Sequence, residues 1–222
     1  MMRSRSWLIV NADELGAGPG VNSGIFEAHR CGTVTSASLL VGTRWSREAA
    51  MAARSMPTLS IGLHVDVDDA LQRDPMLRPK LVRDALRGQL AAFERLIGRA
   101  PTHLDSYHDA HEEPIANAEF LRFARSHRLT LRGLSSIRSV RLPRGTGTDA
   151  LLEILKREIR DGITELVCHP GHLDSGREGS LERVFELKAL CSPRLRATLA
   201  ERSIKPIRHE DVSRLFARAA GF

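Results

Sequence analysis

The sequence predicts an α/β fold built on parallel strands, with a barrel favoured over an open sheet. Short apolar, β-branched runs alternate with segments of helical period about seven times, and no linker or internal repeat divides the 222 residues. Such alternation requires helical crossovers between parallel strands. The seven-strand count and a terminal strand that could pair with the first favour a TIM-like barrel, formed as a single domain over residues 1–222.

The expected strands share an apolar, β-branched composition. They cover 7–11, 34–41, 59–65, 101–105, 129–132, 164–168 and 204–208. The expected helices between them share a helical period. They cover 21–30, 46–55, 79–98, 115–127, 148–160, 181–201 and 211–219. Pro79 suits a first helical turn, and Gly32 and Gly162 follow helical segments where a left-handed cap is favoured.

The composition is that of a globular protein. Hydrophobic residues make up 42% and charged residues 27%, which excludes long disordered or fibrous structure. Apolar runs such as 8–10 are far shorter than the ~20 residues that cross a bilayer, so no membrane span is predicted. The basic N-terminus reaches Asp13 before a secretory apolar core accumulates, and the three cysteines lack CxxC spacing. We therefore expect a cytoplasmic protein with reduced thiols, without a disulfide framework or a cysteine zinc site.

The charge pattern argues against nucleic-acid binding. The net charge is +6, but the arginines are spread among acids on predicted helix faces, and aromatic residues for base stacking make up only 5%. We interpret the arginines as solvated surface and expect no nucleic-acid partner. The one basic stretch, 138–144, is expected to be a loop, with contact to an anionic ligand as the alternative. Partly apolar helix faces fit a homodimer as well as a monomer.

Polar side chains with catalytic or metal-binding chemistry follow four of the predicted strands. They are Asn11, Asp13 and Glu14, then His64, then His103, Asp105 and His108, then His169 and His172. Because the carboxyl ends of parallel strands lie on one face of a β/α fold, we expect these side chains around one mouth. Carboxylates and imidazoles bind divalent ions, and one left free can move protons. The pattern therefore predicts a metal-dependent hydrolase.

Each of these signals alone has a structural explanation. The acids at 13–14 could cap a helix, His64 could be a hydrogen-bonded core histidine, and the run from 103 to 111 could be a solvated loop. The coincidence of four strand ends on one face favours the functional interpretation. The sequence contains no Gly-rich phosphate loop and no Gly-x-Ser-x-Gly elbow, which disfavours nucleotide binding and serine hydrolase chemistry.

Several longer motifs run in order along the chain. They lie at 8–16 (Leu-Ile-Val-Asn-Ala-Asp-Glu-Leu-Gly), 20–29, 32–36, 62–64 (Gly-Leu-His), 102–106 (Thr-His-Leu-Asp-Ser), 168–171 (Cys-His-Pro-Gly) and 186–193. In this order they resemble the YdjC-like carbohydrate deacetylases, a family that includes chitooligosaccharide deacetylases and hopanoid-associated proteins. The family's opening Asn-Ala-Asp-Asp-Phe-Gly corresponds to residues 11–16 here.

The resemblance implies a distorted (β/α) barrel that carries one divalent metal ion, Mg²⁺ or Zn²⁺, and removes N-acetyl groups from amino sugars. By resemblance Asp13 is the catalytic base, and Glu14 and His64 are metal ligands. The sequence departs from the family at two positions. Glu14 replaces an aspartate, and Tyr107 replaces the first histidine of a His-His-x-x-His run, the usual third ligand.

The departure at Tyr107 leaves the third ligand to be assigned. A neutral phenol is a poor ligand because its reference pKa is about 10. We therefore expect His108 to take over this position; the alternatives are that the longer Glu14 compensates or that the site binds metal weakly. The role of His111 is left open.

The proposed chemistry assigns a role to each remaining polar residue. Asp13 would accept a proton from a metal-activated water, and His169 would protonate the leaving amine. His103 and Asp105 would orient the ligand histidine and the base, with a buried hydrogen-bonded pair as the alternative. The competing hypothesis, motivated by Tyr107, is a metal-poor family member that binds a carbohydrate or protein partner without catalysis.

Overall fold

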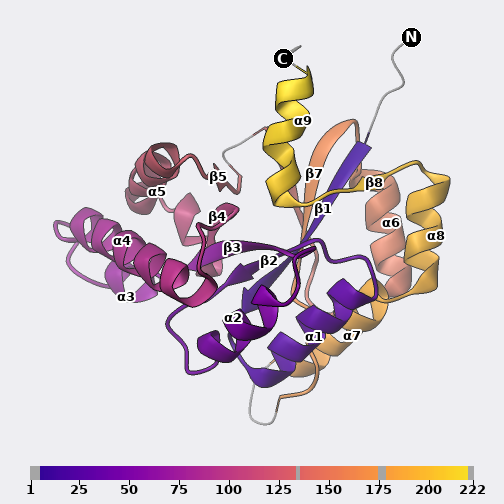
Figure 1. Cartoon of the computed structure of the whole chain (residues 1–222), viewed down its shortest axis with the longest axis horizontal. Helices are drawn as coiled ribbons and strands as arrows, with labels where there is room; N and C mark the ends of the chain where they lie inside the picture. Colours follow the sequence, from indigo (N-terminus) through magenta and orange to yellow (C-terminus); the bar gives the residue numbers. More distant parts are fainter. Residues whose placement is uncertain (1–5, 134–135, 175–178, 220–222) are drawn as a thin grey trace.

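The computed structural model describes residues 6–133, 136–174 and 179–219, with side chains as far as residue 215. A parallel sheet forms its centre and helices surround it (Figure 1). The strands are β1 (Ser6–Leu15), β2 (Ser36–Leu39), β3 (Ser60–Val65), β4 (His103–Ser106), β5 (Thr130–Leu131), β6 (Arg138–Arg141), β7 (Gly162–Cys168) and β8 (Lys205–Pro206). The helices are α1 (Pro19–Arg30), α2 (Ser46–Arg54), α3 (Asp68–Leu71), α4 (Arg78–Ile97), α5 (Pro114–His127), α6 (Thr148–Glu158), α7 (Ser180–Leu190), α8 (Pro193–Glu201) and α9 (Val212–Ala219), with 3-10 turns η1 (Tyr107–Glu112) and η2 (His209–Asp211).

The sheet is a half-barrel of parallel strands. Its order is β5-β4-β3-β2-β1-β7-β6, and every pairing is parallel. The terminal strand β8 does pair with β1, at Trp7 and Leu8, on the edge that β2 occupies further along. Within the described ranges no ladder joins β5 to β6, so hydrogen bonding does not close the barrel. The prediction of a distorted (β/α) barrel is confirmed.

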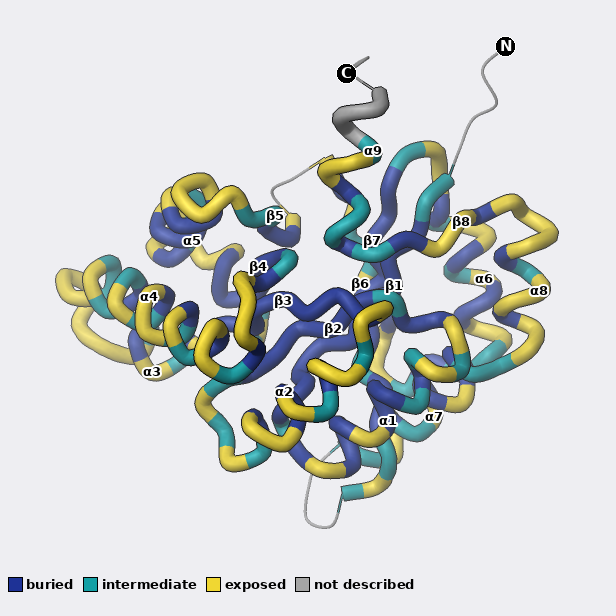
Figure 2. The backbone as a smooth tube through the Cα atoms, in the orientation of Figure 1, coloured by how far each residue is buried: buried dark blue, intermediate teal, exposed yellow. Residues whose placement is uncertain are grey.

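Alternation along the strands separates an apolar outer face from a polar inner face. On β1, Leu8, Val10 and Ala12 belong to the main apolar core with the helices, whereas Asn11 and Asp13 make buried polar contacts. Strands β2, β3 and β4 repeat this pattern. Their buried polar residues are Ser36, Ser38, Ser60, His64, His103 and Asp105. Figure 2 shows the sheet as buried and the outward sides of α4, α5 and α8 as exposed. The fold therefore concentrates polar groups in the interior of the half-barrel.

A small apolar cluster closes the amino end of this interior. Its buried members are Ile9, Ile137, Ile163, Ile207 and Val212. They come from β1, β7, the first residue of α9 and the segments next to β6 and β8. This apolar cluster lies below the polar groups at the carboxyl ends of β1 and β3, such as Asp13 and His64.

A β-bulge at the carboxyl end of β1 sets the directions of two adjacent acidic side chains, Asp13 and Glu14. Ala12 pairs with Ala37 and Leu15 with Leu39, so three steps on β1 oppose two on β2. Within this bulge Glu14 has a φ of 66°, a left-handed conformation that non-glycine residues seldom adopt. In a regular strand, adjacent side chains point to opposite faces. The bulge breaks that rule and brings both acidic side chains close enough to His169 to influence its pKa.

The position of Gly62 shows how tightly the interior is packed. A Cβ atom at this residue would lie 2.4 Å from ring atoms of His103, closer than real Cβ contacts allow. Residue 62 must therefore be glycine for the neighbouring strand to place an imidazole in the interior.

The structure differs from the predicted elements in four places. The predicted helix 181–201 is two helices, because Ser192 caps a new helix that begins at Pro193. The stretch 138–144, predicted as a loop, contains β6, a parallel edge strand on β7. The short helix α3 was not predicted, and β8 is only two residues long. In the described part of the chain, none of the helices has the length and apolarity needed to cross a bilayer.

Candidate active site

A single buried arginine joins three carboxylates inside the half-barrel. Arg132, immediately after β5, donates from Nη1 and Nη2 to the two oxygens of Asp13 at 2.7 Å each. Its Nη2 also lies 2.7 Å from Asp105 and 2.9 Å from Glu165, and its side chain is only 1% exposed. Three carboxylates sharing one guanidinium leave two formal negative charges in a buried region. Such a region favours a further cation.

Arg132 also keeps these acids ionised. Burial by itself opposes ionisation of Asp13, but the guanidinium outweighs it and holds the pKa of Asp13 well below its usual range. The same balance of burial against Arg132 lowers the pKa of Glu165 to about 2. Asn11 donates a further hydrogen bond of 2.8 Å to Asp13. Asp13 is thus a fixed, charged carboxylate.

His64 is oriented by a carboxylate on the next strand. Its Nδ1 lies 2.7 Å from Asp105, whose other oxygen accepts a hydrogen bond of 2.5 Å from Ser38. Burial favours the neutral ring, but the charge of Asp105 outweighs burial and raises the pKa of His64. Its Nε2 makes no hydrogen bond to the described residues. A histidine held by a carboxylate at one nitrogen and open at the other is the usual arrangement of a metal ligand.

The possible metal ligands within the described part of the chain fall into three groups. Their members are Asp13, His64 and Asp105; Asp109, His111 and Glu112; and Glu27, Cys31 and Cys191, with ligand atoms within 4.8 Å of one another in each group. The first group fits a divalent cation, because an open imidazole nitrogen lies in a region of excess negative charge. In the second group, Arg141 already pairs with both acids.

The predicted ligand set of Glu14, His64 and His108 is not assembled. The carboxylate of Glu14 accepts a hydrogen bond of 2.6 Å from the buried Arg183. His108 instead lies 2.8 Å from Asp68, and its side chain is 60% exposed. Because each side chain has another strong partner, the ligand roles of Glu14 and His108 stay predictions.

Tyr107 lies beside His64. The two rings meet edge to face, with centroids 6.0 Å apart, and Tyr107 also packs against His108 at 3.8 Å. Tyr107 lines a cavity of about 620 Å³ that is also bounded by Thr43, Asp66 and Gln89. The phenol therefore lies between the buried polar cluster and an open, partly polar cavity.

Two predicted histidines have structural partners. His103 lies 3.1 Å from the Ser38 hydroxyl and stacks on His209 with centroids 3.8 Å apart, and burial holds its pKa well below the usual range. Because His103 and Asp105 share Ser38, they form the buried hydrogen-bonded network expected of orienting groups. His111 lies 2.6 Å from Ser106, and burial lowers its pKa as well.

His169 lies at the tip of β7, close to both acids of β1. Its Nδ1 is buried without a partner among the described residues, and burial lowers its pKa despite the nearby charges of Asp13 and Glu14. The free ring is therefore neutral near pH 7. To protonate a leaving group it must first take up a proton, and the neighbouring carboxylates favour that step.

Glu186 on α7 binds the backbone of His169. Its carboxylate accepts hydrogen bonds from the backbone N–H of His169 at 2.7 Å and of Gly145 at 3.3 Å. Burial nevertheless raises the pKa of Glu186 to about 7. This carboxyl group therefore titrates near neutral pH while it holds the tip of β7.

Replacing Glu186 by glutamine is expected to change how stability depends on pH. Folded Glu186 keeps its proton up to about pH 7, whereas the unfolded side chain loses it near 4.5, so wild-type stability falls as pH rises through this window. Glu186→Gln should lack that fall, and its stability relative to wild type should increase by up to roughly 3 kcal/mol. Urea unfolding at pH 5 and pH 8 measures the difference. Glu153→Gln, at an exposed position on α6, is the matched control; parallel pH profiles for wild type and Glu186→Gln would contradict the assignment.

Four charged residues of the candidate active site were not predicted from the sequence. They are Arg132, Glu165, Arg183 and Glu186. Glu165 is the one charged residue of the predicted strand 164–168, and Arg132 stands at the end of another, so both positions carried a signal. Arg183 and Glu186 fall within a predicted helix, where charged residues are common; Glu186 also begins the motif at 186–193, whereas Arg183 carried no signal.

Comparison with known proteins agrees with this architecture. The sequence matches the family described as YdjC-like protein over residues 7–201. It is 33% identical to a carbohydrate deacetylase of Geobacillus stearothermophilus, over 94% of this chain and 99% of that protein. It is 32% identical to a chitooligosaccharide deacetylase of Salmonella paratyphi B, over 90% of this chain and 96% of that protein.

A solved structure extends the similarity to three dimensions. The crystal structure of an Enterococcus faecalis protein superposes with a TM-score of 0.81 at 25% identity, over 94% of this chain and 99% of that one. The sequence match and the superposition both span the strands that carry Asp13, His64, Asp105 and His169. This chain belongs to the YdjC-like protein family.

Proposed function

We propose that this protein hydrolyses the N-acetyl group of an amino sugar or a related small molecule, releasing acetate and a free amine. One observation carries the proposal: an ionised, buried Asp13 lies in one cluster with a histidine whose Nε2 is open. A carboxylate that stays charged in a buried site next to an open imidazole favours a bound divalent cation, which would lower the pKa of a water molecule. The deacetylase names of the two relatives support the same chemistry.

The residues have distinct roles in this reaction. A divalent cation, Mg²⁺ or Zn²⁺, held by His64 together with Glu14, would polarise the amide carbonyl and lower the pKa of the attacking water. Asp13 accepts the proton of that water as its oxygen adds to the carbonyl carbon. His169 takes up a proton, from Asp13 or from solvent, and donates it to the amide nitrogen as the C–N bond breaks. Asp105 and His103 hold the imidazole and carboxylate in place through Ser38.

The cavity beside Tyr107 supports a sugar-sized substrate. Its volume of about 620 Å³ accommodates more than one sugar ring, and its lining includes Asp66, Asp69 and Gln89. Carboxylate and amide groups pair with sugar hydroxyls, while Val67 and Leu81 offer apolar surface to the ring faces. We propose that the acetylated sugar lies in this cavity with its amide directed past Tyr107 towards His64.

A second candidate function follows from the altered ligand positions. Tyr107 stands at the family's third ligand position, Glu14 is paired with Arg183, and His108 is turned towards Asp68. A protein with these features could bind a carbohydrate or a protein partner in the same cavity without turnover. The two functions differ in whether acetate is released.

The substitution Tyr107→His separates the two functions. We measure acetate release from N-acetylglucosamine oligomers with Mg²⁺ or Zn²⁺, before and after chelation, in wild type and variant. Because an imidazole replaces a neutral phenol next to His64, the variant should bind the ion at least about 10-fold more tightly. The expected wild-type result is slow, chelator-sensitive acetate release that the variant accelerates.

Two outcomes would contradict parts of the proposal. If neither protein releases acetate while both bind the oligomer, the binding function is favoured over the enzyme. If wild type releases acetate equally well after chelation and in the variant, the protein is an enzyme but the cation has no part in the reaction. Tyr107→Phe is the matched control, since it removes the hydroxyl without adding a ligand.

A further inference from the structure

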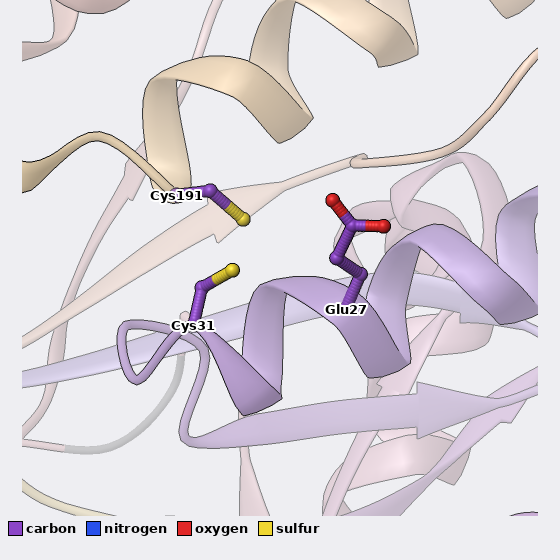
Figure 3. A group of neighbouring side chains, drawn as sticks. All are labelled: Glu27, Cys31 and Cys191. Carbon is purple, nitrogen blue, oxygen red and sulfur yellow. The ribbon is translucent and has the colours of Figure 1, made fainter.

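Two cysteines far apart in sequence meet at the ends of neighbouring helices. Cys31 follows the last residue of α1, and Cys191 follows the last residue of α7. Figure 3 shows their sulfur atoms facing each other, with the carboxylate of Glu27 from α1 on the same side. The ligand atoms of the three side chains lie within 4.8 Å of one another, and all three residues are partly buried. This cluster could not be predicted from the sequence, because 160 positions separate the cysteines.

The cluster has nearly the geometry of a tetrahedral metal site. With Zn–S of about 2.3 Å and Zn–O of about 2.1 Å, ligand atoms around zinc lie roughly 3.6 to 3.8 Å apart. The existing separations therefore need to shrink by about 1 Å or less. Thiolate and carboxylate ligands of this kind select a borderline-soft ion such as Zn²⁺ over Mg²⁺.

The surroundings of the cluster also favour a cation. Both cysteines lie at helix C-termini, where the partial negative charge of the last carbonyl groups attracts positive charge. Arg196 fixes the two helix ends relative to each other, because its Nη1 donates to the carbonyl oxygen of Cys31 at 2.8 Å and to that of Cys191 at 3.5 Å. The ligand positions are thus held before any ion binds.

His172 and a cavity lie next to the cluster of Glu27, Cys31 and Cys191. His172 Nε2 lies 2.9 Å from Glu27 Oε2 and so orients the carboxylate. Glu27, His172 and Cys191 line a cavity of about 440 Å³, which gives an ion and a water molecule access. Without a cation, burial and the Cys31 thiol raise the pKa of Cys191 to about 12, so this thiol stays protonated near neutral pH.

We propose that Glu27, Cys31 and Cys191 bind a zinc-class divalent ion that ties the C-terminal ends of α1 and α7 together. A water molecule completes the tetrahedron, and the displaced thiol protons go to solvent. Helix C-termini in a parallel β/α fold lie towards the amino ends of the strands, away from the candidate active site. The site is therefore structural, and it does not depend on the proposed deacetylase function.

The test measures zinc binding in a protein whose candidate active site is disabled. In a His64→Ala background under reducing conditions, zinc is titrated against a chromophoric chelator. One ion is expected to bind, and adding Cys31→Ser or Cys191→Ser should weaken its binding at least about 100-fold, more than the loss of an orienting group would. Glu27→Gln, which keeps the side-chain shape, should weaken it by about 10-fold or more. Cys168→Ser removes a thiol elsewhere and should leave the zinc affinity unchanged.

Cobalt gives a second, spectroscopic readout. Co²⁺ occupies tetrahedral zinc sites, and cysteine ligands produce a thiolate-to-cobalt charge-transfer band that the two cysteine variants should lose. Equal zinc affinities in the His64→Ala protein and its cysteine variants would overturn the proposal. So would the absence of a thiolate band, or a Cys31–Cys191 disulfide that persists in reductant. If a cysteine variant does not fold, Glu27→Gln decides by the same titration.

Discussion

Asp13→Asn is expected to lower kcat/KM for N-acetyl hydrolysis by about 10³-fold while the protein stays folded. Asparagine keeps the shape of the side chain but cannot accept the proton of the attacking water. The charge of Arg132 would still be balanced, because Asp105 and Glu165 remain 2.7 and 2.9 Å from its Nη2. The loss should therefore appear in catalysis and not in folding.

The measurement combines acetate release with thermal unfolding of the same preparations. Asp84→Asn is the matched control, since Asp84 lies on the exposed surface of α4 and pairs with Lys80. The control should keep the wild-type rate. An Asp13→Asn protein that hydrolyses substrate within 3-fold of wild type would remove Asp13 from the reaction and, with it, the proposed mechanism.

Arg132→Met is expected to lower the free energy of unfolding by about 3 to 5 kcal/mol at pH 7. The substitution leaves Asp13, Asp105 and Glu165 as buried carboxylates without their shared guanidinium. Removing one partner of a buried ionic network costs far more than removing a surface ion pair, because the remaining charges stay desolvated. Arg157→Met on α6 is the control; its side chain is 77% exposed, and its loss should change stability by less than about 0.5 kcal/mol.

The contribution of Asp13 and Glu165 to the pH dependence of stability should reverse its sign in this variant. In wild type, Arg132 outweighs burial and depresses the folded-state pKa values of Asp13 and Glu165, so their contribution to stability is present above about pH 4 and is lost on acidification. Without Arg132, burial alone would raise these pKa values above their unfolded values. Arg132→Met should therefore gain more stability than wild type as the pH falls from 7 to 5, as urea unfolding of both proteins at several pH values would measure. A gain no larger than that of wild type over that range, or Arg132→Met as stable as wild type at pH 7, would contradict the ionic network around Arg132.

The fold could be predicted from the sequence because its signals are local. Each long strand carries apolar residues at every second position on its outer face, as in Leu8, Val10 and Ala12, and each helix carries a continuous apolar stripe. The predicted strands 129–132 and 204–208 are present, but as β5 and β8 of only two residues each. Strand β6 was missed because it is an exposed edge strand of sequence Arg-Ser-Val-Arg, whose apolar content does not distinguish it from a loop.

The candidate site could be predicted only in part. The strand ends at Asp13, His64, Asp105 and His169 were identified because parallel strands must bring their carboxyl ends to one face. Their partners could not be identified in this way, since Arg132 and Arg183 are distinguished from surface arginines only by what they contact. The same limitation applies to His108, which the sequence places next to the site and the structure pairs with Asp68.

The sequence by itself determined the order of strands and helices and the residues available at each strand end. Only the tertiary structure decided which of these side chains meet. Arg132 meets three carboxylates, Glu14 meets Arg183, and Cys31 meets Cys191. The physical reason is the separation along the chain between the residues that interact. Hydrophobic periodicity acts through neighbours along the chain, whereas a buried ion pair or a metal site depends on atoms brought within about 3 to 5 Å across 27 to 169 residues, and packing of the whole domain sets those distances.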